Sequence, residues 1–170
     1  MELDLDDEDS LAPRLARTDR PPVGKPVEIA VVRLPHLSNF TDFQPLILQR
    51  DARVRYISSA SELTDADVVI LPGTKNTMAD LRWLRTSGMA EALGRLREQG
   101  KVIFGVCGGF QMLGSRISDP ERTEAAPGMP EMIAGLGLLD METVFSADKR
   151  QTRIQGRFTD IEGILSGLNG

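Results

Sequence analysis

The 170-residue chain is poor in several residue types, and each scarcity narrows its possible functions. It contains one cysteine, so no disulfide can form within it, which is typical of proteins kept in a reducing cytoplasm. Its formal net charge of -5 disfavours a nucleic-acid surface and docking on anionic lipid, both of which need clustered basic residues. We therefore expect a cytoplasmic protein without nucleic-acid partners.

Long apolar runs are also missing. No stretch approaches the ~18 apolar residues of a membrane-spanning helix, and the chain does not open on a basic segment followed by an apolar one. Neither a membrane partner nor a signal peptide is expected. Aromatic residues make up 5% and hydrophobic residues 41%, which predicts a sizeable core built from aliphatic side chains.

Residues 1–26 differ from the rest because they are first acidic and then rich in proline. Neither a strand nor a helix period persists there, so we interpret them as a linker or tail. A linker at this place predicts that another domain precedes it. The ordered domain is expected over residues 27–170.

Beyond this segment, short apolar runs alternate with helical spacing, which predicts an α/β fold with a mostly parallel twisted sheet flanked by helices. Strands are expected at residues 27–32, 53–57, 68–71, 102–106, 141–145 and 153–158. Helices are expected at 77–85, 89–99 and from 108 to 113, with a short one starting at Thr41 or Asp42 and running through Gln49. Residues 118–135 are interpreted as a surface loop.

The most informative segment is Gly105-Val106-Cys107-Gly108-Gly109, which follows a buried strand and opens a helix. This is the glycine spacing of a nucleophile elbow, with cysteine as the nucleophile. The helix N-terminus favours the thiolate, and the Gly108 N–H can stabilise an oxyanion. An ordinary buried cysteine is the alternative, which the three framing glycines disfavour.

A second loop, Leu71-Pro72-Gly73-Thr74, ends the strand expected at 68–71 and leads into a helix that Thr77 could cap. Loops at the carboxyl ends of parallel strands lie together where ligands bind. Its backbone N–H groups are therefore expected beside Cys107. Lys75 lacks the glycine-rich context of a phosphate-binding loop, so nucleotide binding is rejected there.

With Phe110 and Gln111 added, the elbow resembles the nucleophile motif of class I (triad-type) glutamine amidotransferases, whose fold is flavodoxin-like, and Leu71-Pro72-Gly73 resembles their oxyanion loop. More narrowly, three segments resemble the cobyric acid synthase family, and so does the acidic start of the chain. These segments are residues 33–43, residues 71–85 and residues 135–143.

The resemblance implies that Cys107 attacks the side-chain amide of glutamine and forms a thioester. It implies an oxyanion hole of Gly73, Thr74 and Gly108, and contact between Gln111 and bound glutamine. Members of the family use the ammonia to amidate corrin-ring carboxylates in cobalamin biosynthesis. They use ATP and Mg²⁺ in an N-terminal synthetase domain, so neither a cofactor nor a metal is expected in this chain.

Amide hydrolysis also needs a base, and here the chain departs from the family. The family carries its histidine downstream of the cysteine, whereas the single histidine of this chain, His36, lies upstream. We interpret His36 as a loop residue rather than the base. The domain is thus expected to be incomplete at its C-terminal end and to hydrolyse glutamine negligibly by itself.

Other functions stay open. Cobyrinic acid diamide synthase and the amidotransferase for lipid II share the elbow, although the Ser38-Asn39-Phe40-Thr41-Asp42 loop argues against both. A non-catalytic module with Cys107 as a redox sensor would explain the missing histidine. A cysteine hydrolase of the related chaperone and protease group ranks last, because it gives no role to Gln111.

Overall fold

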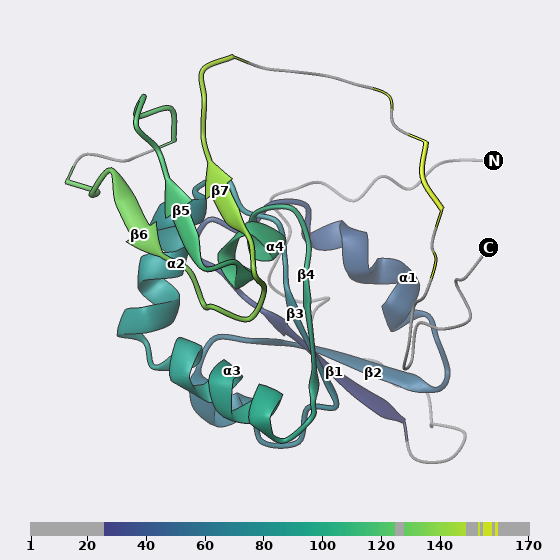
Figure 1. The fold of residues 1–170 in the computed structure, drawn as a ribbon. Coiled ribbons are helices and arrows are strands. Elements are labelled where there is room, and N and C mark those ends of the chain that lie inside the picture. The colour runs from purple at the N-terminus through teal and green to yellow at the C-terminus, as the bar shows by residue number, and fades with distance from the viewer. Residues whose placement is uncertain (1–25, 125–127, 149–152, 154, 158, 160–170) are drawn as a thin grey trace.

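A computed structural model describes residues 26–124, 128–148, 153, 155–157 and 159 of the chain. The expected linker, apart from residue 26, lies outside these residues. A four-stranded parallel sheet has the order β2-β1-β3-β4, and a second sheet has the order β6-β5-β7 (Figure 1). The strands are β1 (Val27–Val32), β2 (Ala52–Ile57), β3 (Val68–Leu71), β4 (Val102–Gly105), β5 (Arg116–Ser118), β6 (Met132–Ala134) and β7 (Glu142–Val144).

The helices are three α-helices packed near the parallel sheet, one shorter α-helix and two single 3₁₀ turns. They are η2 (Phe40–Phe43), α1 (Gln44–Ile47), η3 (Ala60–Leu63), α2 (Thr77–Thr86), α3 (Met89–Glu98) and α4 (Gly108–Leu113). The α/β prediction is confirmed. The first four strands, α2, α3 and α4 lie where the apolar runs and helical spacing predicted them, within two residues.

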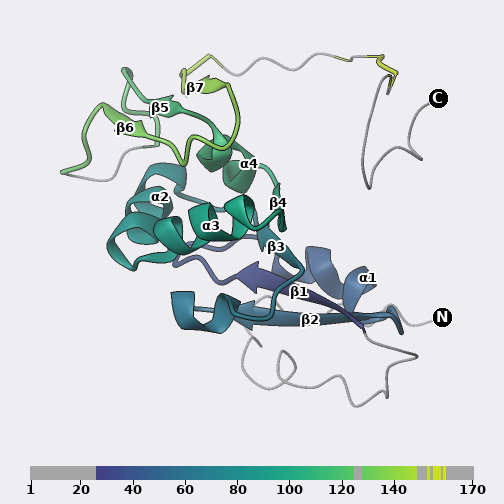
Figure 2. The same ribbon diagram turned by 60° about the horizontal axis from the view of Figure 1, so that its bottom comes forward.

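Strand β1 shows why the sheet is covered on both faces. Ala30 and Val32 belong to the larger buried cluster, whereas Ile29 and Val31 belong to a smaller one. Because successive side chains of a strand point to opposite faces, the unbroken apolar run at residues 29–32 requires a layer on each side. Figure 2 shows α2 and α3 on one side of the sheet and α1 on the other.

Three local predictions were wrong. The segment after β1 forms η2 and then α1, which begins at Gln44 and ends at Ile47, and neither Thr41 nor Asp42 caps it. Asn39, in a left-handed conformation with φ 51°, precedes the 3₁₀ turn. Helix α2 is capped by the Asn76 side chain, which accepts a hydrogen bond from the Ala79 N–H at 3.0 Å, and not by Thr77.

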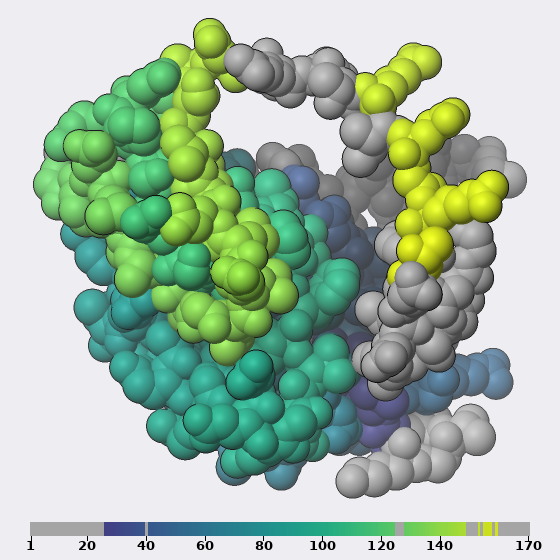
Figure 3. Space-filling view, in the orientation of Figure 1, coloured from purple at the N-terminus to yellow at the C-terminus, as the bar shows by residue number. Residues whose placement is uncertain are grey.

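The second sheet was only partly predicted. Within the expected loop at 118–135 the structure has β6, antiparallel to β5, while β7 matches the strand expected at 141–145. Residues 153 and 155–157, the described part of the strand expected at 153–158, are not in a strand. Figure 3 shows the green and yellow-green residues of this sheet lying against the teal residues of the helices.

Hydrogen bonds fix the second sheet to the end of α4. The Leu136 N–H donates to the Met112 carbonyl and the Leu138 N–H to that of Leu113, each at 2.8 Å. The loop between β6 and β7 therefore lies next to the helix that carries the elbow. Among the described residues, no helix combines the length and the apolar character that crossing a bilayer requires.

Candidate functional site

Cys107 lies between the end of β4 and the start of α4, at the sharp turn that its glycine spacing predicted. Its backbone has φ 50° and ψ -114°, a conformation that residues with a side chain rarely adopt, and the residue is exposed. Such strain persists only where the surroundings enforce it, and it is common at reactive residues. The prediction of an ordinary buried cysteine does not fit this exposure.

Two glycines enforce the turn by close approach. A Cβ atom on Gly109 would lie 2.0 Å from the Leu71 carbonyl oxygen, so α4 can begin against the end of β3 only without a side chain there. A Cβ atom on Gly105 would lie 2.6 Å from the Phe110 Cα. Strand β4 and helix α4 thus meet at backbone contact, and the chain must turn sharply at Cys107.

The loop after β3 lies beside the elbow, because β3 and β4 pair in parallel with Leu71 opposite Gly105. The β-carbon position of Gly73 is 3.7 Å from the Cys107 Cβ. The β-carbon position of Gly108 is 3.5 Å from the Thr74 backbone nitrogen. The structure therefore brings Gly73, Thr74 and Gly108 to the cysteine, as the strand order predicted.

The peptide between Gly73 and Thr74 has a defined orientation. Its carbonyl accepts a hydrogen bond from the Ser38 N–H at 3.0 Å. The two polar groups of a trans peptide point in opposite directions, so the Thr74 N–H points away from Ser38. Within the part of the chain that the structure describes, neither this N–H nor that of Gly108 donates a hydrogen bond. Both remain available to an acceptor near Cys107.

Gln111 stands one turn into α4, and its backbone N–H donates to the Cys107 carbonyl at 3.0 Å. The residue is half-buried. Its backbone is thereby tied to the elbow, while the contact with glutamine stays a prediction.

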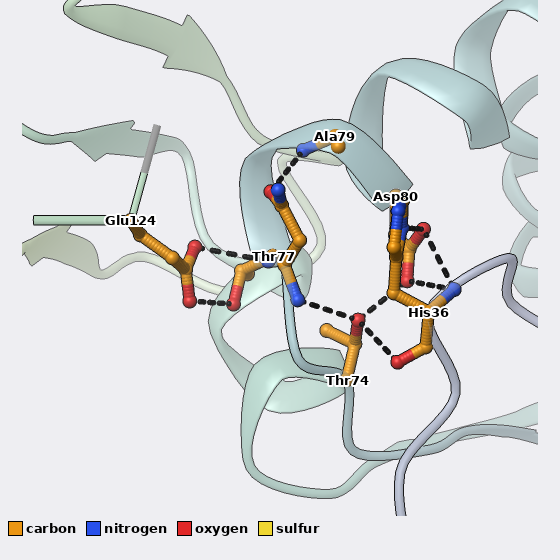
Figure 4. A network of polar contacts seen from close by, with 7 residues as sticks. His36, Thr74, Thr77, Ala79, Asp80 and Glu124 are labelled. Carbon is orange, nitrogen blue, oxygen red and sulfur yellow. Dashed lines mark hydrogen bonds and ion pairs between the residues drawn. The ribbon is translucent and has the colours of Figure 1, made fainter. Parts of the chain in front are cut away.

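Sequence reasoning missed a polar network on the other side of the loop that follows β3 (Figure 4). The Asp80 carboxylate, 0% exposed, accepts from the Thr74 hydroxyl at 2.5 Å and lies 2.7 Å from the His36 Nδ1. An aspartate in the first turn of a helix is common because it suits the helix dipole. Nothing in the sequence therefore marked Asp80 as a buried hub whose partners come from two loops.

Glu124, in the segment between β5 and β6, holds the N-terminus of α2 from the opposite side. Its carboxylate accepts from the Thr77 N–H and from the Thr77 hydroxyl, each at 2.9 Å. Burial, with a smaller contribution from Asp119, raises the pKa of Glu124 above its ordinary value, although the bonds from Thr77 oppose the rise. The second sheet is therefore connected to the helix that follows the oxyanion loop.

His36 lies 2.7 Å from Asp80 through its Nδ1. No hydrogen bond or ion pair among the described residues joins His36 to Cys107, so the structure does not pair the two as base and nucleophile. The described residues also contain no cluster of three potential metal ligands.

Comparison with known proteins agrees with this site. Residues 28–167 match the model of the CobB/CobQ-like glutamine amidotransferase domain. A solved glutamine amidotransferase structure superposes with a TM-score of 0.52 at 20% identity, over 72% of this chain and 59% of that one, a likeness of fold.

Similar curated proteins carry the name cobyric acid synthase. The one from Ruminiclostridium cellulolyticum is 42% identical over 170 residues, which are 100% of this chain and 32% of that protein. The one from Yersinia enterocolitica is 47% identical over 156 residues, which are 92% of this chain and 29% of that protein. The chain thus spans about a third of the length of the curated relatives it matches.

Proposed function

This chain belongs to the CobB/CobQ-like glutamine amidotransferase domain family, and we propose that it is the glutamine-hydrolysing part of a cobyric acid synthase. The observation that carries the proposal is the exposed Cys107 on a strained elbow, beside two backbone N–H groups without an acceptor among the described residues. A nucleophile next to unpaired donors suits attack on a carbonyl.

In the proposed reaction the Cys107 sulfur attacks the side-chain carbonyl carbon of glutamine. The carbonyl oxygen gains negative charge, and the N–H groups of Thr74 and Gly108 donate to it. The C–N bond then breaks, ammonia leaves with a proton supplied by a general acid, and a glutamyl thioester remains. Water hydrolyses the thioester to glutamate and frees the thiol. Gln111 is proposed to contact the glutamine.

These 170 residues provide the nucleophile and the oxyanion donors but no histidine besides His36. We propose that the chain by itself hydrolyses glutamine negligibly, because ammonia must be protonated as it leaves. Addition of glutamine to the isolated chain should release no ammonia above the rate of the Cys107→Ala variant. Release at an enzyme-like rate that the variant abolishes would contradict this.

The ammonia is proposed to amidate corrinoid carboxylates that ATP and Mg²⁺ activate in a synthetase domain, located in the two-thirds of the relatives' length beyond this match. The free thiol that this chemistry requires suits the cytoplasm. Residues 1–26 are proposed to be the connection to that domain.

The test is a comparison of two nitrogen sources in the full-length gene product. Cys107→Ala should abolish corrinoid amidation with glutamine and leave amidation with ammonium chloride within about twofold of the unmodified protein, because ammonia bypasses the thioester. Loss of amidation with both glutamine and ammonium chloride, or loss with neither of them, would contradict the assignment. Amidation of lipid II or of cobyrinic acid instead would identify the related enzymes.

The redox-sensor alternative predicts a different result. The glutamine analogue 6-diazo-5-oxo-norleucine should label Cys107 in the amidotransferase, and glutamine should protect it. Oxidation of Cys107 by peroxide without such labelling would favour the sensor.

A further inference from the structure

The loop that carries the Thr74 N–H is held in place by the segment after β1. The Ser38 N–H donates to the Gly73 carbonyl at 3.0 Å, and the Lys75 N–H donates to the His36 carbonyl at 2.9 Å. Leu37 and Thr74 face each other between these two bonds as an isolated antiparallel bridge. In such a bridge the two central residues do not donate to each other, and the Thr74 N–H, which donates to no acceptor among the described residues, is available to substrate.

One buried carboxylate connects both segments to a rigid element. Asp80 lies in the first turn of α2 and accepts from the His36 backbone N–H at 3.2 Å, besides its contact with the imidazole. The oxygen that accepts from this N–H, Oδ2, also accepts from the Thr74 hydroxyl, which in turn accepts from the Asn76 N–H at 3.1 Å. A carboxylate without solvent exposure needs such partners, so the helix holds both loops through charge-assisted hydrogen bonds.

We propose that His36 is a positioning residue for glutamine hydrolysis, which acts through Asp80 and Thr74 to fix the direction of the Thr74 N–H toward the oxyanion. This inference rests on the proposed function. His36 is suited to the task because its backbone carbonyl holds Lys75 while its ring and backbone N–H hold Asp80. The 2.7 Å contact with a carboxylate calls for a proton on Nδ1, so the imidazole donates to Asp80 through this nitrogen.

The expected effect follows from the geometry of oxyanion stabilisation. A donor acts on the transition state only within hydrogen-bond distance of the oxyanion, and a misplacement of about 1 Å can reduce the rate about 100-fold. Glutamine in its ground state gains little from this donor. Loss of the His36 ring should therefore lower kcat and leave KM nearly unchanged.

The test uses glutamine hydrolysis by the full-length gene product and matched substitutions. His36→Leu removes the ring donor from a side chain that is 48% exposed, so the fold is expected to persist. His36→Asn places an amide N–H where the Nδ1–H was. We expect kcat to fall about tenfold in His36→Leu with KM within about twofold, and to return to within about threefold in His36→Asn.

Thr74 provides a second pair. Thr74→Val removes the hydroxyl that binds Asp80 and should lower kcat about 100-fold, whereas Thr74→Ser keeps the hydroxyl and should stay within about threefold. The control is Lys101→Met, which breaks an ion pair with Asp67 of 2.9 Å at the other end of the sheet and should leave kcat unchanged.

The outcomes separate the inference from the function on which it rests. Unchanged kcat in His36→Leu, no recovery in His36→Asn, or a loss expressed mainly in KM would overturn the positioning role alone. A loss of kcat in Lys101→Met equal to that in His36→Leu would also overturn the positioning role, because it would indicate a general effect of lower stability. An unmodified protein without glutaminase activity, or one that Cys107→Ala leaves active, would overturn the proposed function together with this inference.

Discussion

Two loops meet at the carboxyl edge of the parallel sheet, and different forces hold them. The elbow at Cys107 is shaped by steric contact, because Gly105 and Gly109 let α4 begin against the backbone of β3 and β4. The loop at Thr74 is shaped by hydrogen bonds: it accepts one from Ser38 and donates to His36 and Asp80. The steric contacts are between backbone atoms, within the elbow at Gly105 and across to Leu71 at Gly109, whereas the polar contacts of His36 reach Thr74 and Asp80 through side chains, 38 and 44 positions away.

Because different forces hold the two loops, they should respond differently to substitution. Backbone atoms in contact cannot move apart without displacing the strand or the helix, so an added methyl group should be costly. A hydrogen-bonded loop can relax and take up water, so its loss should affect stability less and geometry more. Four substitutions test this comparison, from the largest expected effect to the smallest.

The largest effect is expected from Gly109→Ala. Its Cβ would lie 2.0 Å from the Leu71 carbonyl oxygen and 2.7 Å from that of Pro72, both of them backbone atoms. We expect the free energy of unfolding to fall by about 4 kcal/mol or more, measured by urea denaturation. Gly94→Ala is the control, because that helical position has nothing within 4 Å, and it should gain about 1 kcal/mol. A small loss in Gly109→Ala would contradict the steric account.

Asp80→Ala should have the next largest effect on stability. It leaves the His36 N–H and Nδ1 without their acceptor and the Thr74 hydroxyl with only the His36 carbonyl, at a cost of about 2–3 kcal/mol in the free energy of unfolding. Asp67→Ala also removes a carboxylate that accepts from a backbone N–H and a cation, yet it is 38% exposed and should cost about 1 kcal/mol or less. Equal losses would mean that the buried network is no stronger than a surface pair.

Cys107→Gly should stabilise the protein while abolishing the nucleophile. The backbone at φ 50° and ψ -114° strains any residue with a side chain, and glycine adopts it freely. The free energy of unfolding of Cys107→Gly should therefore be about 1–2 kcal/mol higher than that of Cys107→Ala. The two variants can be compared directly because neither has a thiol. Greater stability of the alanine variant would show that the turn is not strained.

The smallest effect concerns pH. The raised pKa of Glu124 means that the folded state keeps a proton over a range where the unfolded state has lost it. Stability contributed by Glu124 should therefore fall as pH rises from about 4.5, the ordinary value, to the raised pKa. The difference in unfolding free energy between the unmodified protein and Glu124→Gln should decrease over this range.

Glu62 provides a control of opposite sign. Hydrogen bonds, first from the Ser59 side chain and then from the Ser58 backbone, lower its pKa. Its contribution is present above the ordinary pKa and is lost as pH falls. Glu62→Gln should thus remove a stabilisation that grows with pH, measured by thermal unfolding from pH 3 to 7. The same sign in both variants would contradict the account of Glu124.

The sequence by itself determined the parallel sheet and the elbow. Val68–Leu71 is apolar at every position and Val27–Val32 at every position except Glu28, which indicates strands covered on both faces. The requirement for small residues around Cys107 is likewise local, so the glycine spacing expresses it directly. Loops that follow neighbouring parallel strands lie at the same edge of the sheet, which predicts that Gly73 lies beside the cysteine, as it does.

The tertiary structure alone decided the partners of Asp80, Glu124 and His36. The contact between His36 and Asp80 spans 44 positions of sequence and that between Glu124 and Thr77 spans 47, and no periodic pattern in the chain indicates either pairing. Strand β6 was missed for a similar reason, since three residues show too little alternation to mark a strand. Packing brings these groups together because a buried carboxylate must find donors, wherever in the sequence they lie.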